Sequence, residues 1–191
     1  MKKYELTEET VTVYGKTLYR IRAVRDFGSV KTGEFGGYIE KEENLSHFGN
    51  AWISGDAWVY GDARVSGDAR VFDNAKVYGD AKVYGDARVA GDAWVYGNAW
   101  VYGNAWVYGN AEVFNTRHFF VQGPIGSRAG YVTFYRTKDD TIGVRCGCFS
   151  GSLQKFVDRV EETHGGSRYE KEYKIAAELA KVCIRLEGES R

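Results

Sequence analysis

Residues 49–114 read GNAWIS GDAWVY GDARVS GDARVF DNAKVY GDAKVY GDARVA GDAWVY GNAWVY GNAWVY GNAEVF. These eleven six-residue units follow one pattern, Gly-[Asp/Asn]-Ala-x-Val-x, without a break. Ile53 is the one departure from the Val column, and Asp73 is the one departure from the Gly column. A strict short period of this kind predicts a solenoid, in which each unit stacks on its neighbours.

The alternation inside each unit predicts a short strand followed by a corner. Ala and Val lie two positions apart, so they share one face of an extended segment, and this small apolar face must point inward. The residue between them points outward and is Trp, Arg, Lys or Glu. Because Gly tolerates positive φ and Asx side chains bond to local backbone, the Gly-Asx pair predicts a tight turn.

The repeat resembles the hexapeptide-repeat family, as the unit Val59-Tyr60-Gly61-Asp62-Ala63-Arg64 and its copies show. The resemblance covers about a third of the chain. It implies a left-handed parallel β-helix with three hexads in each triangular coil, so that residues eighteen apart stack in columns. Ile39 and Leu45 precede Ala51 at the same spacing, and we therefore expect the first coil to begin near Gly37.

Two modules flank the predicted solenoid of residues 37–115. Residues 1–36 carry short strand patterns and predict a β cap, because a solenoid leaves bare strand edges at its ends. Residues 116–191 predict a small α+β module of ββαα type. Its elements are a hairpin of 131–136 with 141–146, a helix over 153–164 and a second helix over about 169–186. The chain is thus predicted to be mainly β.

The second of these helices carries two neighbouring apolar stripes. One contains Tyr173, Ala176, Ala180 and Ile184, and the other contains Ile175, Leu179, Val182 and Leu186. This apolar face is wide for so small a module. We therefore expect part of it to pack on the solenoid end or on another subunit.

Composition limits the classes of function. The formal net charge is zero and no long block of like charge occurs, which speaks against general nucleic-acid binding and against binding to anionic membranes. The first residues lack the apolar run of a signal peptide, and no segment is long enough to span a bilayer. Three cysteines, an odd number, favour free thiols in a reducing compartment. We expect a cytoplasmic protein of a bacterial host.

Three copies of Trp-Val-Tyr predict an aromatic belt around one coil. Its members are Trp94, Tyr96, Trp100, Tyr102, Trp106 and Tyr108. The three tryptophans are expected on three different faces. So much aromatic surface is unfavourable in water, so we expect the C-terminal module, another subunit or a partner to cover it. Relatives in the hexapeptide-repeat family are often trimers, and the resemblance implies a homotrimer here.

The resemblance also implies an alternative function, that of an acyltransferase using acyl-CoA. In that family a histidine at a cleft between subunits acts as the general base. Residues 49–114 contain no histidine, so His47 in the first, irregular coil is the catalytic candidate that remains. A packing role for His47 is the competing interpretation. The histidine-free repeat favours a non-catalytic protein that needs no cofactor.

The segment Cys146-Gly147-Cys148-Phe149-Ser150-Gly151-Ser152 is a second candidate site. A strand, a Gly-containing turn and a helix start would place backbone N–H groups around an anion, beside a thiol of lowered pKa. The candidates are Cys146, Cys148, Ser150 and Ser152. The arginine of a phosphatase-type loop is absent, so a plain strand-to-helix turn with Ser150 or Ser152 as N-cap competes with this interpretation.

A metal site is the remaining alternative for the same segment. Cys146 and Cys148 are two apart on the expected strand and so face the same way, and His164 and Cys183 complete a set of four ligands. This spacing is not a recognised zinc pattern. Buried thiols account for it equally well, and we expect no metal.

The order of the three parts resembles that of uncharacterised proteins encoded by bacteriophages and prophages. The resemblance rests on FGGYIEKEENLS at 35–46, the GDA/GNA repeats, GSR at 126–128, CGCFSG at 146–151, THG at 163–165, Tyr169 and Tyr173. It implies a phage or prophage origin. We expect a non-catalytic oligomeric scaffold that binds a host or phage component, for example one of host defence. A small-ligand binder, holding a nucleotide or another anion at a subunit seam or near residues 147–152, is the third alternative.

Overall fold

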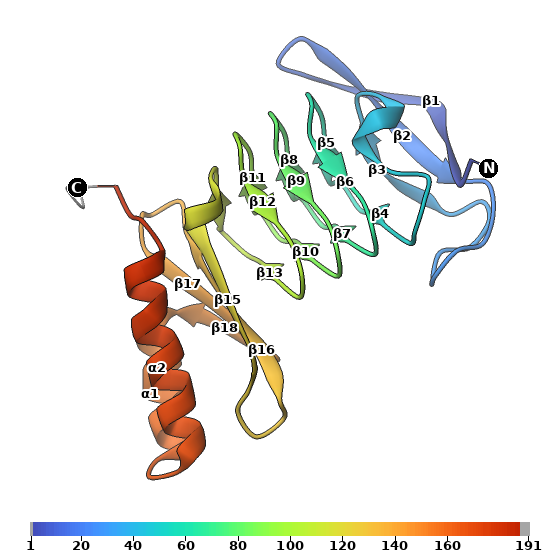
Figure 1. Ribbon diagram of the computed structural model, residues 1–191. Coiled ribbons are helices and arrows are strands. Elements are labelled where there is room, and N and C mark those ends of the chain that lie inside the picture. The colour runs from blue at the N-terminus through green and yellow to red at the C-terminus, as the bar shows by residue number, and fades with distance from the viewer. Residues whose placement is uncertain (1, 188–191) are drawn as a thin grey trace.

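A computed structural model describes residues 2–187 and shows a solenoid with a module at each end (Figure 1). Each hexad contributes a strand of two residues, the outward residue and the inward valine or isoleucine that follows it. The inward alanines and valines are almost completely buried and form one continuous core. The mainly β fold with a parallel β-solenoid is thereby confirmed.

Three faces make up the solenoid, and parallel strands stack on each of them. The first face contains β3 (Phe35–Ile39), β5 (Trp58–Val59), β8 (Lys76–Val77), β11 (Trp94–Val95) and β14 (Glu112–Val113). The second contains β4 (Trp52–Ile53), β7 (Arg70–Val71), β10 (Arg88–Val89) and β13 (Trp106–Val107). The third contains β6 (Arg64–Val65), β9 (Lys82–Val83) and β12 (Trp100–Val101).

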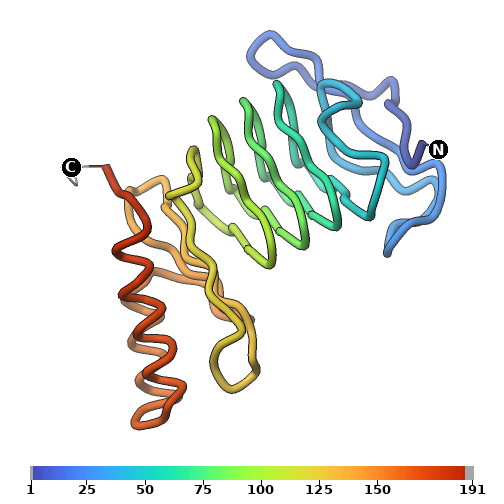
Figure 2. Tube along the Cα trace, viewed as in Figure 1, coloured from blue at the N-terminus to red at the C-terminus, as the bar shows by residue number. Residues whose placement is uncertain are grey.

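The register confirms three hexads per coil. Trp58 pairs with Lys76, and Arg64 pairs with Lys82, so partners lie eighteen residues apart as expected. The irregular first coil is also confirmed, because β3 pairs with β5 in parallel and Leu45 forms a bridge to Val65. The tube view shows these coils as regularly stacked turns (Figure 2).

The N-terminal module closes the first end of the solenoid. β1 (Tyr4–Val13) and β2 (Lys16–Ala23) form an antiparallel hairpin, and β2 pairs with β3 on the first face. The short helix η1 (Glu42–Asn44) follows. The buried Tyr4 hydroxyl donates to the carbonyl oxygens of Glu42 and Leu45 at 2.9 and 2.8 Å. These contacts cover the bare edge of the first coil.

The C-terminal module begins after the short helix η2 (Thr116–His118). Its antiparallel sheet contains β15 (Phe119–Ile125), β16 (Gly130–Arg136), β17 (Ile142–Cys146) and β18 (Phe149–Ser152). Helices α1 (Leu153–His164) and α2 (Arg168–Cys183) cover one side of it. The predicted β16–β17 hairpin is confirmed. Two flanking strands were not predicted, and α2 ends at Cys183 rather than near residue 186.

Alternation along β16 explains how the module attaches. Val132 and Phe134 point toward the helices and belong to the core of the module. Tyr135 points the other way and joins the solenoid core. A strand that is buried on both sides carries large apolar residues at consecutive positions, as Phe134 and Tyr135 do. The solenoid, the sheet and the helices are therefore three successive layers.

One stripe of α2 packs as expected and the other does not. Tyr173, Ala176, Ala180 and Ile184 are buried against the sheet. Ile175, Leu179 and Val182 stay exposed, at 68%, 43% and 80% of their surface. Of the two alternatives expected for this wide face, packing on the solenoid end is wrong for these three residues, because the sheet lies between α2 and the solenoid. Packing on another subunit stays a prediction. No helix within residues 2–187 is long and apolar enough to cross a membrane.

Candidate functional site

The aromatic belt divides into three parts, one on each face, as the register predicts. Trp94, Trp100 and Trp106 lie on β11, β12 and β13. The C-terminal module covers two of these parts and touches the third through Phe119, whose ring lies edge-on to Tyr102 with ring centres 5.7 Å apart. Part of the belt is thus covered by the chain itself.

On the first face, two lysines cover Trp94. The Lys76 ammonium lies 5.3 Å and the Lys138 ammonium 4.4 Å from the centre of a Trp94 ring. Tyr96 stacks between Tyr78 and Phe114, with ring centres 4.9 and 5.3 Å away. This column of stacked aromatic rings stiffens the end of the solenoid.

On the second face, Trp106 is held between the solenoid and the sheet. The Arg145 guanidinium lies 4.0 Å from its ring centre and 4.9 Å from that of Tyr108. Arg88, from the preceding coil, lies 5.3 Å from the Trp106 ring. The Trp106 backbone N–H donates to Thr133 Oγ1 at 2.9 Å. Trp106 therefore packs between the solenoid and the C-terminal module and is not free to form an interface with another subunit.

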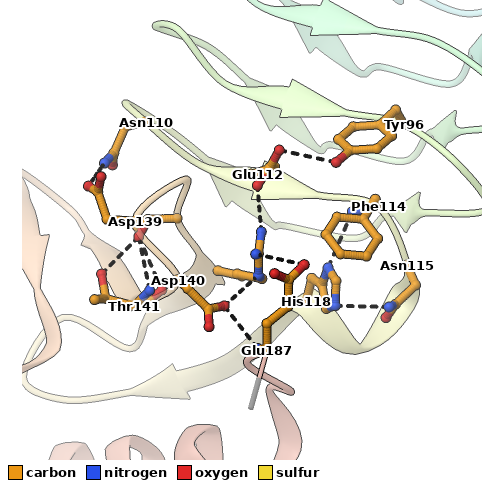
Figure 3. Close-up of polar contacts among 12 residues, drawn as sticks. Tyr96, Asn110, Glu112, Phe114, Asn115, His118, Asp139, Asp140, Thr141 and Glu187 are labelled. Atoms are coloured by element: carbon orange, nitrogen blue, oxygen red, sulfur yellow. Dashed lines mark hydrogen bonds and ion pairs between the residues drawn. The ribbon is translucent and has the colours of Figure 1, made fainter.

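A buried polar network locks the module to the last coil (Figure 3). The Arg136 side chain, only 4% exposed, donates to Glu112 at 2.5 Å and to Asp140 at 2.8 Å, and lies 3.3 Å from Glu187. Glu112 also accepts from the Tyr96 hydroxyl at 3.1 Å. One cation thus ties the solenoid, the β16–β17 turn and the end of α2 together.

His118 lies beside this network and is itself buried. Its Nδ1 accepts from the Phe114 N–H at 3.4 Å, and its Nε2 lies 2.9 Å from Asn115 Nδ2. Burial, and then the nearby Arg136 charge, lower the pKa of His118 to about 4. Its imidazole is therefore neutral near pH 7 and serves packing and hydrogen bonding.

A wide cleft opens where the second face meets the module. Its walls come from the last coils, the β15–β16 turn, the β17–β18 hairpin and α1. Basic residues outnumber acidic ones in its lining: Arg88, Arg128, Arg145, Lys155 and Arg159 against Asp86, Asp158 and Glu162. Trp106, Tyr131 and Phe149 add aromatic surface.

The thiol segment lies on this cleft, but with a different local structure from the one predicted. Cys146, Cys148 and Ser150 line the cleft. Gly147, at φ +55°, and Cys148 form the turn of a hairpin, since β18 intervenes before α1. The predicted strand-to-helix anion loop is therefore wrong. Ser152 does cap α1, accepting from the Lys155 N–H, as the competing interpretation expects.

The chemistry expected of these cysteines also changes. Burial raises the pKa of the Cys146 thiol, so the prediction of a lowered thiol pKa is wrong for this residue. Cys148 lies in the turn, and so the two cysteines do not share one side of a strand. Within residues 2–187, no group of three or more His, Cys, Asp or Glu side chains is arranged to hold a metal ion. The set Cys146, Cys148, His164 and Cys183 does not come together.

His47 belongs to the N-terminal cap. Its ring stacks on Tyr4 with centres 4.3 Å apart, and its Nδ1 accepts from the Lys3 N–H at 3.3 Å. Its Nε2 lies 3.7 Å from a Glu42 carboxylate oxygen. Burial lowers the pKa of His47, although Glu42 opposes this effect. These contacts give His47 a packing role, and the residues that line the C-terminal cleft do not include it.

The third face is the open one. All of its outward residues, Arg64, Lys82 and Trp100, are exposed, whereas the outward residues of the first face are half-buried. Trp100 and Tyr102 keep 43% and 44% of their surface exposed. The Lys82 ammonium lies 4.6 Å from a Trp100 ring centre. This face carries the most exposed part of the belt.

Sequence reasoning missed Arg136, Glu112 and Arg145. Glu112 offered a signal, because it is the one acidic residue at an outward repeat position. A carboxylate that ends an otherwise basic and aromatic series predicts a cationic partner in the next module. Arg136 and Arg145 lie on adjacent predicted strands, and nothing in their local sequence shows which one is buried.

The fold and this surface define the class of the protein, a β-solenoid repeat protein with a cap at each end. The family model described as YdcK beta solenoid repeat matches residues 63–79, 81–97 and 93–109. These ranges lie within the solenoid, so the chain is similar to that family in its repeats. No curated protein matches the chain.

Proposed function

We propose that this protein is a non-catalytic β-solenoid scaffold that assembles into a homotrimer through its third face. The exposure of every outward residue on that face is the observation that carries the proposal. The modules cover parts of the other two faces, at Trp94 and Trp106 by the C-terminal module and near Trp52 by the N-terminal one. Trp100 and Tyr102 stay exposed although Lys82, Tyr84 and Phe119 lie against their rings, and such aromatic surface fits the centre of an interface.

The charges of the third face are self-complementary. An acidic column, Asp62 and Asp80, runs beside a basic column, Arg64 and Lys82. Among residues 2–187, no ion pair uses Arg64, Lys82 or Asp80. Asp62 pairs with Lys41 at 2.7 Å. Most of the face therefore has charges available to another copy.

Rotation about an axis parallel to the solenoid brings these columns together. In such an assembly the basic column of one copy lies against the acidic column of its neighbour, and each contact repeats around the axis. The resemblance to the hexapeptide-repeat family supports three copies. Both end modules cover strand edges, so growth into an open filament by end-to-end stacking is disfavoured.

The resemblance to phage and prophage proteins supplies the proposed setting. We place the trimer in the cytoplasm of a bacterial host, where it binds a host or phage component, such as one of host defence. Recovery of the tagged protein from infected cells, with identification of whatever elutes with it, tests this part. A protein that elutes alone in repeated experiments would contradict it.

Reversing single charges on the third face tests the proposed trimer. Lys82→Glu and Asp80→Lys should each lower the mass measured by light scattering from three times 21.5 kDa toward the monomer. Combining the two changes should restore the trimer, because the opposite columns again match. A mass that stays unchanged in both single variants contradicts the proposal.

Removal of aromatic surface is a second test of the same face. Trp100→Ser with Tyr102→Ser should also favour the monomer. Tyr14→Ser is the matched control, since Tyr14 is an exposed aromatic on the N-terminal hairpin and its loss should leave the mass unchanged.

A further inference from the structure

We propose that the C-terminal cleft binds a small phosphorylated ligand with a planar ring, of the nucleoside phosphate class. Arg145, Lys155 and Arg88 would bind the phosphate, and the exposed Tyr131 would contact the ring. This inference is independent of the third face, which lies on another side of the solenoid. It concerns a site that a single chain contains completely.

Unpaired cations make the cleft suitable for an anion. Arg88, Arg128, Arg145 and Lys155 take part in no ion pair among residues 2–187. Arg159, the fifth basic residue of the lining, is paired with Glu162 at 2.9 Å. Four cations that line the cleft therefore lack a carboxylate partner. The planar guanidinium of arginine in particular matches the geometry of a phosphate group.

Two buried donors at the base of the cleft lack an acceptor. Arg145 Nε and Trp106 Nε1 are inaccessible to solvent and make no hydrogen bond within the described chain. Buried polar atoms are normally paired, so an additional acceptor that gains access to these donors would be favourable there. The Arg145 guanidinium is already fixed over the Trp106 ring at 4.0 Å. It is thus preorganised to hold an oxygen ligand.

Aromatic side chains beside these cations favour a ring in the ligand. Tyr131 keeps 43% of its surface exposed, and it lines the cleft together with Trp106 and Phe149. Any nucleobase can stack on an aromatic side chain, because every base has a planar π face. The three lining carboxylates, Asp86, Asp158 and Glu162, interrupt the positive surface and disfavour a long nucleic-acid backbone. A small nucleotide offers a ring to the aromatic side chains and only a short anionic group to the cations.

Binding of adenosine monophosphate and guanosine monophosphate, measured by calorimetry on the whole chain, tests the proposal. We expect one site per chain. Arg145→Gln and Lys155→Gln should each weaken binding by roughly tenfold or more, since each removes one charge-assisted contact. Lys155 is exposed, so its variant does not endanger folding. Arg22→Gln on the N-terminal hairpin is the matched control and should bind normally.

Thiol labelling locates the ligand. Cys148 is exposed on the cleft, whereas Cys183 at the end of α2 does not line it. A bound nucleotide should slow the reaction of Cys148 with a maleimide and leave that of Cys183 unchanged. Equal protection of both thiols would contradict the assigned site.

Four further results would overturn the proposal. They are no binding at millimolar nucleotide, equal binding of adenosine and its monophosphate, equal binding of inorganic phosphate and the nucleotide, and unchanged affinity in both cleft variants. A failure of the trimer tests leaves all these measurements interpretable, because the cleft belongs to one chain.

Discussion

At the residue scale, neighbouring positions of the repeat have opposite environments. Val83 is fully buried while Lys82 beside it is exposed, and the same alternation holds along the array. The inward positions were predictable from the sequence because a period of two fixes their direction. The partners of the outward positions were not, since cover by Arg145 or Lys138 depends on where a separate module docks.

His118 carries a pH dependence that can be measured. Its pKa is about 4 in the folded chain against 6.5 for an ordinary histidine, so between these values only the unfolded chain binds the proton. The contribution of His118 to stability should therefore be fully present above pH 6.5 and be lost as the pH decreases toward 4, by roughly 1–3 kcal/mol. Urea unfolding from pH 7 to pH 4.5 should show this slope.

The variant His118→Gln isolates the effect. It should be less stable at pH 7, because the Phe114 N–H loses its acceptor, but the slope due to this residue should disappear. His164→Gln, on α1, is the control and should keep the slope. An identical slope in the His118 variant and the natural chain would contradict the assignment.

At the element scale, each coil depends on glycines at its corners. Gly67 has a φ of +69°, and a Cβ added there would lie 2.9 Å from the Gly85 nitrogen of the next coil. Gly103, near the last corner, has a φ of +63° but nothing within 4 Å of such a Cβ. Asp73 is the one array position that accepts a side chain at this φ, and its carboxylate accepts from the Gly91 N–H at 3.1 Å.

Two alanine substitutions separate conformational strain from steric contact between coils. Gly103→Ala should cost about 1–2 kcal/mol, the usual cost of a non-glycine residue in the left-handed region. Gly67→Ala should cost more, roughly 2–4 kcal/mol, because the added methyl also pushes two coils apart. Chemical denaturation gives both values. Equal losses would show that contact between coils contributes nothing.

The elements themselves were predictable to different degrees. The hexads, the β16–β17 hairpin and both helices follow from hydrophobic period and turn residues. β15 was missed because Gly123 and Pro124 interrupt its apolar pattern, and β18 was missed because Phe149–Ser152 also suits a helix start. The cleft needs the last coils, the β15–β16 turn, the β17–β18 hairpin and α1 together, so no single segment revealed it.

At the scale of the whole molecule, Arg136 determines how firmly the C-terminal module is joined to the solenoid. Arg136→Met should destabilise the fold by roughly 1–3 kcal/mol, since Glu112 and Asp140, both half-buried, lose the cation that they share. Hydrogen exchange should rise at the Trp106 and Lys138 amides, which bond across the joint to Thr133 Oγ1 and the Asn110 carbonyl.

Arg159→Met provides the matched control for this joint. Arg159 and Glu162 form an exposed pair on α1, with 66% and 69% of their side chains accessible. Its loss should change stability by less than about 0.5 kcal/mol and leave exchange at the joint unaltered. A similar cost for both arginines would contradict a locking role for Arg136.

The three-hexad coil also makes the solenoid a spacer with a defined length and a defined phase. Removing or adding eighteen residues would shift the C-terminal module along the axis by about 4.8 Å and keep its orientation. Removing only six would turn it by about a third of a revolution around that axis. Gain or loss of whole coils during evolution can therefore alter the distance between the two ends of the molecule in uniform steps. Gain or loss of a single hexad would instead rotate the C-terminal cleft relative to the N-terminal module.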